Sequence, residues 1–273
     1  MERYAVVGNP VGHSKSPQIH AAFARQTGQS ISYEALLAPL EGFADYARDF
    51  FNSGGKGLNV TVPFKLDAFQ FADQCSARSR NAGAVNTLSI DQNNKILGDN
   101  TDGVGLVRDI LSNHQGIIRN RRVLVLGAGG AVRGVLEMLM REQPAQLTIA
   151  NRTVAKAEQL AASFTDCGPV SATSFAELEG ERYDFVINGT SASLQGDLPP
   201  LPSSLLAPGA WSYDLMYARA DTPFTSWAKA HGAGKTLDGL GMLVEQAAES
   251  FFIWRQIRPE TLPVIQLIRE QLQ

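Results

Sequence analysis

Lys65 and Asp102 are the two side chains best suited to transfer a proton. Lys65 comes just after the run 57–62, an expected strand, and ligands bind beyond strand ends in open α/β sheets. Asp102 lies in the turn 99–103, directly before an expected helix. A lysine and an aspartate held together in a cleft can pass a proton to an oxygen that is gaining negative charge. Alternatively, Lys65 is a surface charge and Asp102 a helix cap.

A glycine-rich turn between an apolar run and a helical pattern could bind phosphate. It follows the run 122–126 and opens a helix that extends to about residue 141. Backbone N–H groups and the helix dipole would then face a pyrophosphate. The usual G-x-G-x-x-G pattern is incomplete, because Val132 occupies the third glycine position, and a plain tight turn is the alternative. The expected cofactor-binding residues of this turn are Gly127, Ala128, Gly129, Gly130 and Ala131.

The end of the next strand indicates which dinucleotide would bind. NAD enzymes place an acidic residue about 20 residues after the glycine turn, to hold the ribose 2′-hydroxyl. This chain has Asn151, Arg152 and Thr153 there, with Lys156 one turn later. Arg152 can pair with a 2′-phosphate, which a carboxylate would repel, so the pattern favours NADP. The alternative is that Arg152 and Lys156 are only solvated charges at a helix start.

The N-terminal segment 8–17 is glycine-rich, polar and preceded by a strand. Ser14 and Ser16 flank a lysine immediately before a helix. Two hydroxyls beside a helix N-terminus suit a small anion such as a carboxylate. The alternative is that Ser16 simply caps the helix.

Composition excludes several other classes of protein. The 273 residues carry a formal net charge of −3 without a basic run, which argues against nucleic-acid binding. No apolar stretch reaches the roughly 18–20 residues of a membrane span, and the N-terminus lacks the pattern of a secretory signal. The four histidines lack metal-ligand spacing, and two distant cysteines form neither a disulfide framework nor a zinc site. We therefore expect a cytoplasmic protein without a metal.

These residues sit in a chain that alternates short apolar runs with helical periods. Such alternation predicts βαβ units around a parallel sheet, and therefore an α/β fold. Strands are expected at 4–7, 31–37, 57–62, 122–126, 147–150 and 183–187, with a hairpin over 86–97. Helices are expected from residue 16, over 41–51, from residue 102, from the glycine turn to about residue 141, and over 154–164 and 241–254. The pattern changes near residues 102–103 and again near 239–241, which predicts two domains.

Seven segments in this order resemble the shikimate dehydrogenase family of the aromatic amino-acid pathway. The resemblance covers essentially the full chain. The segments are residues 9–17, 59–65, 83–87, 98–103, 127–131, 151–153 and 238–246.

The resemblance implies an oxidoreductase that reversibly reduces 3-dehydroshikimate to shikimate with NADPH, a step of chorismate biosynthesis. Lys65 and Asp102 match the catalytic pair of the family, with Lys65 relaying the proton. Ser14 and Ser16 match the positions that hold the substrate carboxylate. The positions that read the ring hydroxyls match Thr61, Asn86, Asp102 and Gln246. Tyr217 matches a substrate-side tyrosine, and Gly239 and the backbone of Leu215 match positions near the nicotinamide.

The resemblance also implies a two-domain architecture. The substrate domain would comprise residues 1–102 plus 240–273, with C-terminal helices completing its N-terminal α/β part. An NADP-binding Rossmann domain, residues 103–239, would be inserted between them. The expected partners are small molecules, with no nucleic acid or membrane, and the chain would be a monomer or a homodimer. Two alternatives stay open: a quinate/shikimate dehydrogenase of broader cofactor use, and a non-catalytic NADP-binding module on the same fold.

Overall fold

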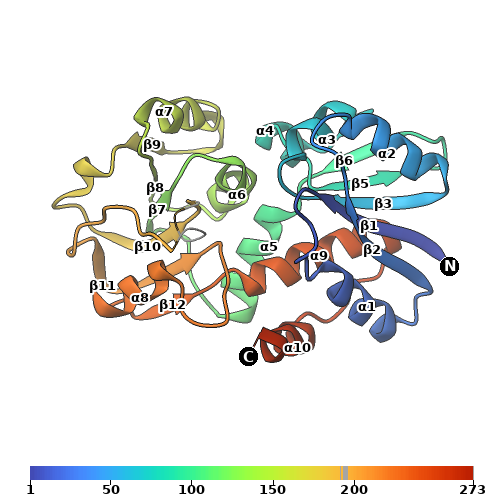
Figure 1. Ribbon diagram of the computed structural model, residues 1–273. Coiled ribbons are helices and arrows are strands. Elements are labelled where there is room, and N and C mark those ends of the chain that lie inside the picture. Colours follow the sequence, from blue (N-terminus) through green and yellow to red (C-terminus); the bar gives the residue numbers. More distant parts are fainter. Residues whose placement is uncertain (191, 193–195, 273) are drawn as a thin grey trace. The chain divides into compact units, whose positions relative to one another are not determined.

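The computed structural model describes residues 1–190, 192 and 196–272 (Figure 1). The chain forms two compact units, each with its own sheet. The terminal unit comprises Met1–Gly105 and Leu243–Gln271, and the central unit mainly Leu106–Met242. The division falls within α5 (Asp102–Arg108) and α9 (Leu240–Arg255), so the chain passes between the units inside helices.

The sheet of the terminal unit has six strands in the order β2-β1-β3-β5-β6-β4. Its strands are β1 (Glu2–Gly8), β2 (Ile31–Leu37), β3 (Gly55–Val60), β4 (Gln74–Cys75), β5 (Thr87–Ile90) and β6 (Ile96–Asp99). The first three are parallel, whereas β5 runs antiparallel to β3 and β6. The expected hairpin over residues 86–97 is the antiparallel pair β5–β6, and it makes this sheet mixed. Because β3 and β6 run in the same direction, their carboxyl ends meet at one edge.

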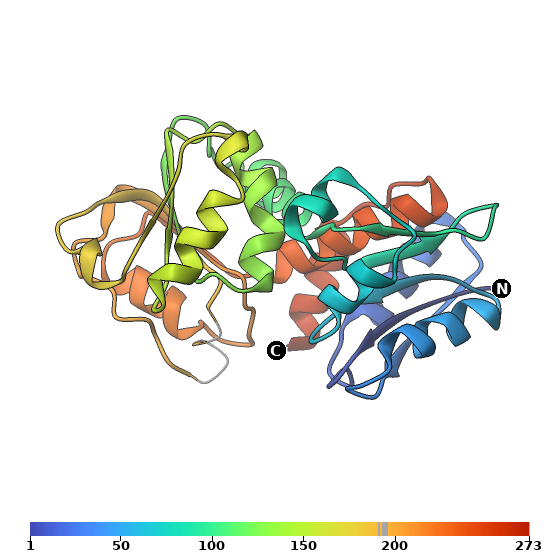
Figure 2. The same ribbon diagram turned by 90° about the horizontal axis from the view of Figure 1, so that it is seen from above.

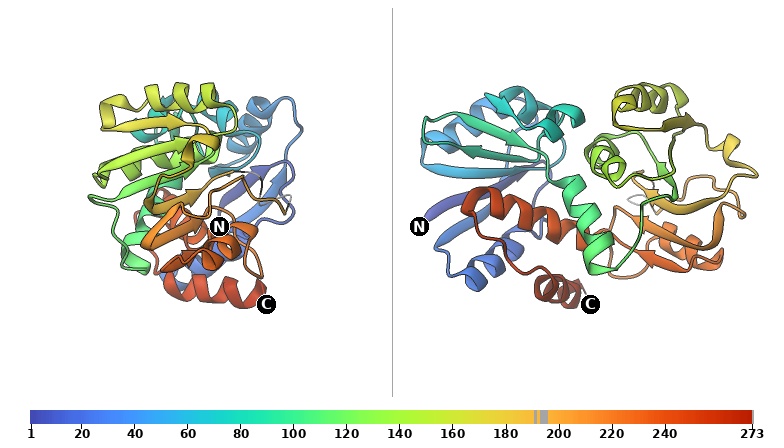
Figure 3. Two further views of the ribbon diagram at one scale, coloured as in Figure 1. Left: turned by 90° about the vertical axis from the view of Figure 1, so that its left-hand side faces the viewer. Right: turned by 180° about the vertical axis from the view of Figure 1, so that it is seen from behind.

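Helices cover both faces of this sheet. They are α1 (Ser16–Thr27), α2 (Phe43–Asn52), α3 (Lys65–Phe71), α4 (Ala77–Ala82), most of α9, and α10 (Leu262–Leu272). Figure 1 and Figure 3 show α2 and α3 over one face and α1 and α9 over the other. Under α2 the buried core includes Phe43, Phe50 and Leu58. On the other face, the rings of Phe23 and Trp254 pack around His20.

The central unit is built on six parallel strands in the order β12-β11-β10-β7-β8-β9. Its strands are β7 (Arg122–Leu126), β8 (Gln146–Ala150), β9 (Val170–Thr173), β10 (Tyr183–Asn188), β11 (Leu206–Asp214) and β12 (Lys235–Leu237). Numbered within the unit, this is the 3-2-1-4-5-6 order of the dinucleotide-binding fold. The strand order reverses between β7 and β10, at the carboxyl edge where ligands bind in such sheets.

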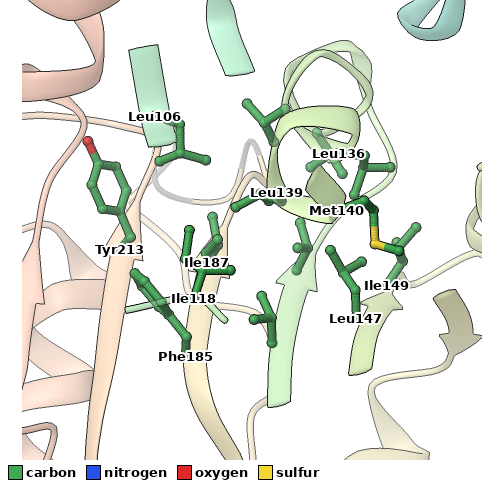
Figure 4. Close-up of a cluster of buried hydrophobic side chains, with 14 of the residues drawn as sticks. Leu106, Ile118, Leu136, Leu139, Met140, Leu147, Ile149, Phe185, Ile187 and Tyr213 are labelled. Atoms are coloured by element: carbon green, nitrogen blue, oxygen red, sulfur yellow. The ribbon is translucent and has the colours of Figure 1, made fainter. Parts of the chain in front are cut away.

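Both faces of the central sheet are covered, which is why β7 is apolar at nearly every position. Val123 and Val125 face the core beneath α6 (Gly130–Arg141) and α7 (Val154–Ala162), which lie side by side (Figure 2). Leu124 and Leu126 face the core beneath α8 (Pro223–Ala230). Figure 4 shows Leu136 and Leu139 of α6 above the strands, and burying each such side chain contributes about 1.5–3 kcal/mol. The described part of the unit also contains a π-helix (Asp109–Asn113) and the 3₁₀ turns Thr165–Cys167 and Ala176–Leu178.

Several expected boundaries differ from the structure by one or two residues, and two of these differences affect candidate site residues. β3 covers residues 55–60 instead of 57–62, so Thr61 lies in the turn beyond the strand. Ser16 was expected as the cap of α1 but is its first residue, and Lys15 occupies the cap position. The hydroxyl that serves this helix start belongs to Ser14, whose Oγ accepts a hydrogen bond from the Ser16 N–H at 3.2 Å.

Candidate active site

Lys65 and Asp102 form an ion pair at one edge of the terminal sheet. Lys65 begins α3 after the turn that follows β3, and Asp102 begins α5 shortly after β6. Lys65 Nζ donates to Asp102 Oδ2 at 2.5 Å. The lysine side chain is 22% exposed and that of the aspartate 8%, so the ammonium group keeps access to a ligand. The pair can therefore act at an oxygen that approaches Lys65.

Asn86 holds the second oxygen of Asp102. Its Nδ2 donates to Asp102 Oδ1 at 2.8 Å, and its Oδ1 accepts from the Thr101 backbone N–H at 2.9 Å. Gln246 reaches the same place from α9, where its Oε1 lies 3.4 Å from Asn86 Nδ2 and 3.3 Å from Thr101 Oγ1. Asn86 is buried and Gln246 half-buried. Four of the expected site residues are thus joined in one hydrogen-bonded group.

Thr61, Ser14 and Ser16 follow the carboxyl ends of neighbouring strands. Thr61 comes directly after β3, half-buried, and its N–H donates to the Val7 carbonyl at 2.9 Å. Ser14 and Ser16 lie after β1, which is parallel to β3, so they belong to the same sheet edge. Ser16 is buried and Ser14 half-buried. The arrangement offers hydroxyl groups beside the start of a helix, which suits an anion.

The glycine turn of the central unit leads from β7 into α6. Gly127 has a φ of 102°, and a Cβ there would lie 3.1 Å from the Gly189 carbonyl oxygen, so this position requires glycine. A Cβ added to Gly129 or Gly130 would meet no atom of the described chain within 4 Å. Ala128 is half-buried and Ala131 exposed. The start of α6 is therefore open for a phosphate group to approach its N–H groups.

Val132 stands where the usual motif has its third glycine. The side chain is fully buried, and its Cγ2 fills the space that a Cβ on Gly189 would occupy. Gly189 follows β10, the strand next to β7. Gly189, beside β10, therefore makes room for α6 to pack closely on the sheet, so residue 132 does not have to be glycine. This explains why the motif is incomplete.

Asn151, Arg152 and Thr153 form the turn between β8 and α7. Asn151 Nδ2 donates to the Thr153 carbonyl at 2.9 Å, which closes the turn. Arg152 and Lys156 are exposed, and within the described part of the chain neither forms an ion pair. Two cations beside a closed turn, next to the strand that carries the glycine turn, fit a phosphate ligand.

Leu215, Tyr217 and Gly239 lie together beyond β11 and β12. The Gly239 N–H donates to the Met216 carbonyl at 2.9 Å, and a Cβ on Gly239 would collide with the Leu215 carbonyl. Burial raises the pKa of Tyr217, and the negative charge of Asp238 adds to this. The phenol therefore stays protonated near neutral pH.

Four polar residues beneath the Lys65–Asp102 pair, three of them buried and Tyr33 half-buried, were not anticipated. They are Tyr33, Asn59, Thr87 and Ser250. The available signals were weak: Asn59 interrupts an apolar strand, and Ser250 follows Gln246 by one helical turn. Among the described residues, no three His, Cys, Asp or Glu side chains are grouped as metal ligands would be. No described helix is long and apolar enough to span a bilayer.

The strand order and the glycine turn of the central unit define the class of dinucleotide-binding α/β proteins. The shikimate dehydrogenase (NADP(+)) of Alkalilimnicola ehrlichii is 59% identical over 270 residues, which cover 99% of both chains. The enzyme of the same name from Cellvibrio japonicus is 56% identical, over 98% of this chain and 97% of the relative. The chain belongs to the shikimate dehydrogenase family.

Family models and solved structures agree with this membership. Models described as shikimate dehydrogenase substrate binding domain, shikimate/quinate 5-dehydrogenase and shikimate 5′-dehydrogenase C-terminal domain match residues 6–88, 109–195 and 239–272. The crystal structure of an Ael1 enzyme from Pseudomonas putida has a TM-score of 0.92 at 45% identity, covering 100% of this chain and 98% of its own. Shikimate 5-dehydrogenase from Thermus thermophilus, in complex with NADP(H) and shikimate, has a TM-score of 0.87 at 33% identity, covering 100% of both. The broader quinate/shikimate activity and the non-catalytic module are not favoured.

Proposed function

We propose that the protein is an NADP-dependent shikimate dehydrogenase, which reversibly reduces 3-dehydroshikimate to shikimate in the biosynthesis of chorismate and the aromatic amino acids. The observation that carries this proposal is the 2.5 Å Lys65–Asp102 pair, braced by Asn86, in a chain of this family. A protein that only binds NADP has no need of a partly exposed lysine held by a buried carboxylate.

In this proposal each unit binds one of the two ligands. Residues 1–102 with 240–273 bind the substrate, and residues 103–239 bind NADP. The match of residues 6–88 to a substrate-binding-domain model supports the first assignment. The strand order of the central unit, with its glycine turn after β7, supports the second.

Lys65 and Asp102 are the catalytic residues in this mechanism. When bound, NADPH supplies the hydride that reduces the carbonyl carbon of 3-dehydroshikimate. Lys65 donates a proton to the carbonyl oxygen as negative charge develops there, and takes it back in the reverse direction. Asp102 orients the lysine, because one of its oxygens binds Nζ while the other is held by Asn86. Orientation of this kind lowers the barrier by fixing the geometry in advance.

Substrate recognition uses the polar groups around this pair. Ser14 and Ser16 bind the substrate carboxylate. The ring hydroxyls form hydrogen bonds with Thr61, Asn86, Asp102 and Gln246. A substrate that lacks one of these hydroxyls would leave buried polar groups unpaired, which gives strong discrimination.

NADP recognition rests on the open helix start and the exposed cations of the central unit. The pyrophosphate binds along Gly127, Ala128, Gly129, Gly130 and Ala131. The 2′-phosphate binds Arg152, with Lys156 and the turn residues Asn151 and Thr153 beside it. Leu215, through its backbone, and Gly239 lie near the nicotinamide.

The proposed setting is the cytoplasm, where the two free cysteines, Cys75 and Cys167, stay reduced. The partners are small molecules only. The protein acts as a monomer or a homodimer, which light scattering on the purified protein would distinguish.

Absorbance of NADPH tests the proposed function. Purified protein is mixed with shikimate and NADP⁺, with parallel samples that contain quinate or NAD⁺. Rapid reduction with shikimate and NADP⁺ alone is expected. Comparable rates with quinate or NAD⁺ would identify a broad-specificity enzyme instead. Absence of reduction in every sample, with NADP⁺ still bound, would leave a binding module.

A further inference from the structure

Among the described strands, β2 is the only long one at the edge of a sheet. The two sheets have four edge strands, β2 and β4 in the terminal unit and β9 and β12 in the central unit. β4 has two residues, β12 three and β9 four, whereas β2 has seven. Proteins commonly protect a sheet edge by keeping its strand short. β2 lacks this protection, so its free edge can form hydrogen bonds with another extended chain.

Other features that protect a sheet edge are also missing from β2. The strand contains neither proline nor lysine, and it pairs with β1 from Ile31 to Leu37 without a bulge. None of its residues is buried, and Glu34, Ala35 and Leu37 are exposed. Figure 1 shows β2 beyond β1, at the end of the terminal sheet. The outer edge of β2 is therefore accessible to a partner.

The hydrogen bonds at the two ends of β2 show which backbone groups face outward. The Ser30 carbonyl accepts from the Glu2 N–H, and the Ala38 N–H donates to the Gly8 carbonyl, so both groups face β1. Because successive residues of a strand point their backbone groups to alternate sides, the even-numbered residues of β2 face β1. The odd-numbered residues face away from it, and in the described part of the chain their N–H and C=O groups have no hydrogen-bond partner.

We propose that β2 pairs antiparallel with β2 of a second copy of this chain, which joins two six-stranded sheets into one continuous sheet. A second copy supplies an edge of equal length with the same free backbone groups. The resulting two-fold dimer is closed, because both copies use the same edge and the opposite edge, β4, has only two residues. This inference does not depend on the proposed function.

A two-fold axis at Tyr33 gives the best pairing of the two strands. Residues opposite each other in an antiparallel pair point to the same face of the sheet, so the axis must pass through a residue. With the axis at Tyr33, this residue pairs with its own copy and Ile31 pairs with the partner's Ala35. These three outward pairs form two hydrogen bonds each, about six in all. An axis at Ser32 would place Ala35 opposite the partner's Gln29, which lies outside β2, and lose part of these bonds.

The charges on one face of the sheet are complementary in this register. Arg3 of β1 lies beside Ser32, and the partner's Glu34 would lie on the other side of Ser32. Neighbouring strands are about 4.8 Å apart, so the long Arg3 side chain can extend over the small serine toward that carboxylate. Within one copy Arg3 Nη2 lies 3.5 Å from Glu34 Oε1, so the single charge of β2 is balanced. An axis at Glu34 would instead place two carboxylates directly opposite each other, which is unfavourable.

Sedimentation velocity on the purified full chain tests the dimer. The wild type should form a species with twice the mass of one chain, and this species should dissociate on dilution. Ala35→Pro removes an outward N–H without removing a hydrogen bond to β1, and proline is tolerated at such edge positions. This variant should be monomeric at concentrations where the wild type is dimeric. Ala35→Val keeps the N–H and should form dimers as the wild type does.

Ser32→Glu and Ser32→Gln test the register with side chains of equal size. A glutamate at this position lies beside Arg3 of its own copy, so the monomer should stay folded, but it faces the partner's Glu34 across the interface. We expect its dimer dissociation constant to be about 3- to 30-fold higher than that of Ser32→Gln, because each dimer contains two such like-charged pairs. Equal constants would refute the register centred on Tyr33.

The other outcomes decide whether β2 is the interface at all. A wild type that stays monomeric at every concentration, or that forms species larger than a dimer, would overturn the proposal. So would dimers that persist in folded Ala35→Pro. If a melting curve shows that this variant does not fold, hydrogen exchange of the wild type decides instead. The N–H groups of Ile31, Tyr33 and Ala35 should then exchange more slowly at high protein concentration, and unchanged exchange would exclude pairing through β2.

Discussion

Lys65 combines partial exposure with a firm contact to Asp102, and this combination suits proton transfer. We predict that Lys65→Ala lowers kcat by about 10²–10⁴-fold, the range of a lost general acid. Asp102 keeps its hydrogen bond from Asn86 in this variant, so the protein should stay folded. Steady-state rates and a melting curve from the same sample test this. Intact turnover would show that the pair is only structural.

Arg152 is the residue that we expect to distinguish NADP⁺ from NAD⁺. Arg152→Ala should raise the KM for NADP⁺ about 10- to 100-fold, the effect of losing a charged hydrogen bond, and leave that for NAD⁺ nearly unchanged. Arg121→Ala is the control, because Arg121 is also exposed but precedes β7, at the edge of the sheet opposite to the one that carries Arg152. It should leave both KM values unchanged. Equal changes for both cofactors would contradict a 2′-phosphate role.

His20 makes the stability of the terminal unit depend on pH. The imidazole is fully buried, and this burial lowers the pKa of His20 from 6.5 to about 3, although the nearby Asn59 side chain acts in the opposite direction. Between these values the unfolded chain binds the proton that the folded chain excludes. Stability therefore falls as the pH drops below 6.5, by about 1.4 kcal/mol per pH unit from this group.

His20→Phe tests this origin of acid sensitivity. The variant keeps an aromatic ring against Tyr33 and Trp254 but removes the titrating group. Urea unfolding between pH 7 and pH 4.5 should show a shallower loss of stability in the variant than in the wild type. Parallel curves would mean that other groups cause the acid sensitivity.

At the scale of single residues, the sequence was most informative where chemistry and position coincide. Lys65 and Asp102 each follow a strand, and the structure joins them at 2.5 Å. The roles of these residues in catalysis stay predictions. Tyr33 and Ser250 could not be found this way, because each lies in an element that is otherwise explained by packing. Their polar role depends on contacts with residues 26 and 191 positions away.

Among the elements, the short apolar strands were the most predictable and the irregular ones the least. β2 covers residues 31–37 and β7 residues 122–126, as expected, because both are bounded by clear turn signals. β11 was not anticipated, since Pro208 and Gly209 lie inside it and resemble a loop. The hairpin over residues 86–97 was expected and is the antiparallel pair β5–β6, whereas its place beside β3 could not be expected, because that depends on long-range pairing.

The start of α8 supports the loop that carries Leu215 and Tyr217. Thr222 caps this helix, accepting from the Thr225 N–H at 3.2 Å, and its hydroxyl donates to Asp214 Oδ2 at 2.6 Å. We predict that Thr222→Val costs about 1–2 kcal/mol of stability through loss of the cap. Thr222→Ser should recover most of this in urea unfolding. Equal destabilisation by both substitutions would indicate that packing matters and the hydroxyl does not.

At the scale of the whole molecule, each unit has its own hydrophobic core. We therefore predict that each ligand slows hydrogen exchange mainly in the unit that binds it. Shikimate should slow amide hydrogen exchange in β1, β3 and β5, and NADP⁺ in β7, β8 and β10. At a hundredfold excess over its Kd, each ligand should stabilise the unit that binds it by about 2.7 kcal/mol. Hydrogen exchange followed by mass spectrometry tests this. If NADP⁺ slowed exchange only in β1–β6, the terminal unit would bind the cofactor and the proposed assignment of the two units would be wrong.

The terminal unit is made from both ends of the chain, which has a consequence during synthesis. At about 5–20 residues per second, a ribosome needs roughly 7–27 s to translate residues 106–242. The central unit is therefore complete while the first sheet still lacks α9, whose Trp254 ring packs on Tyr4 and whose Phe251 ring packs on Phe23. During that interval the nascent N-terminal sheet exposes an aromatic face, and this face is the part of the newborn chain that a chaperone would bind.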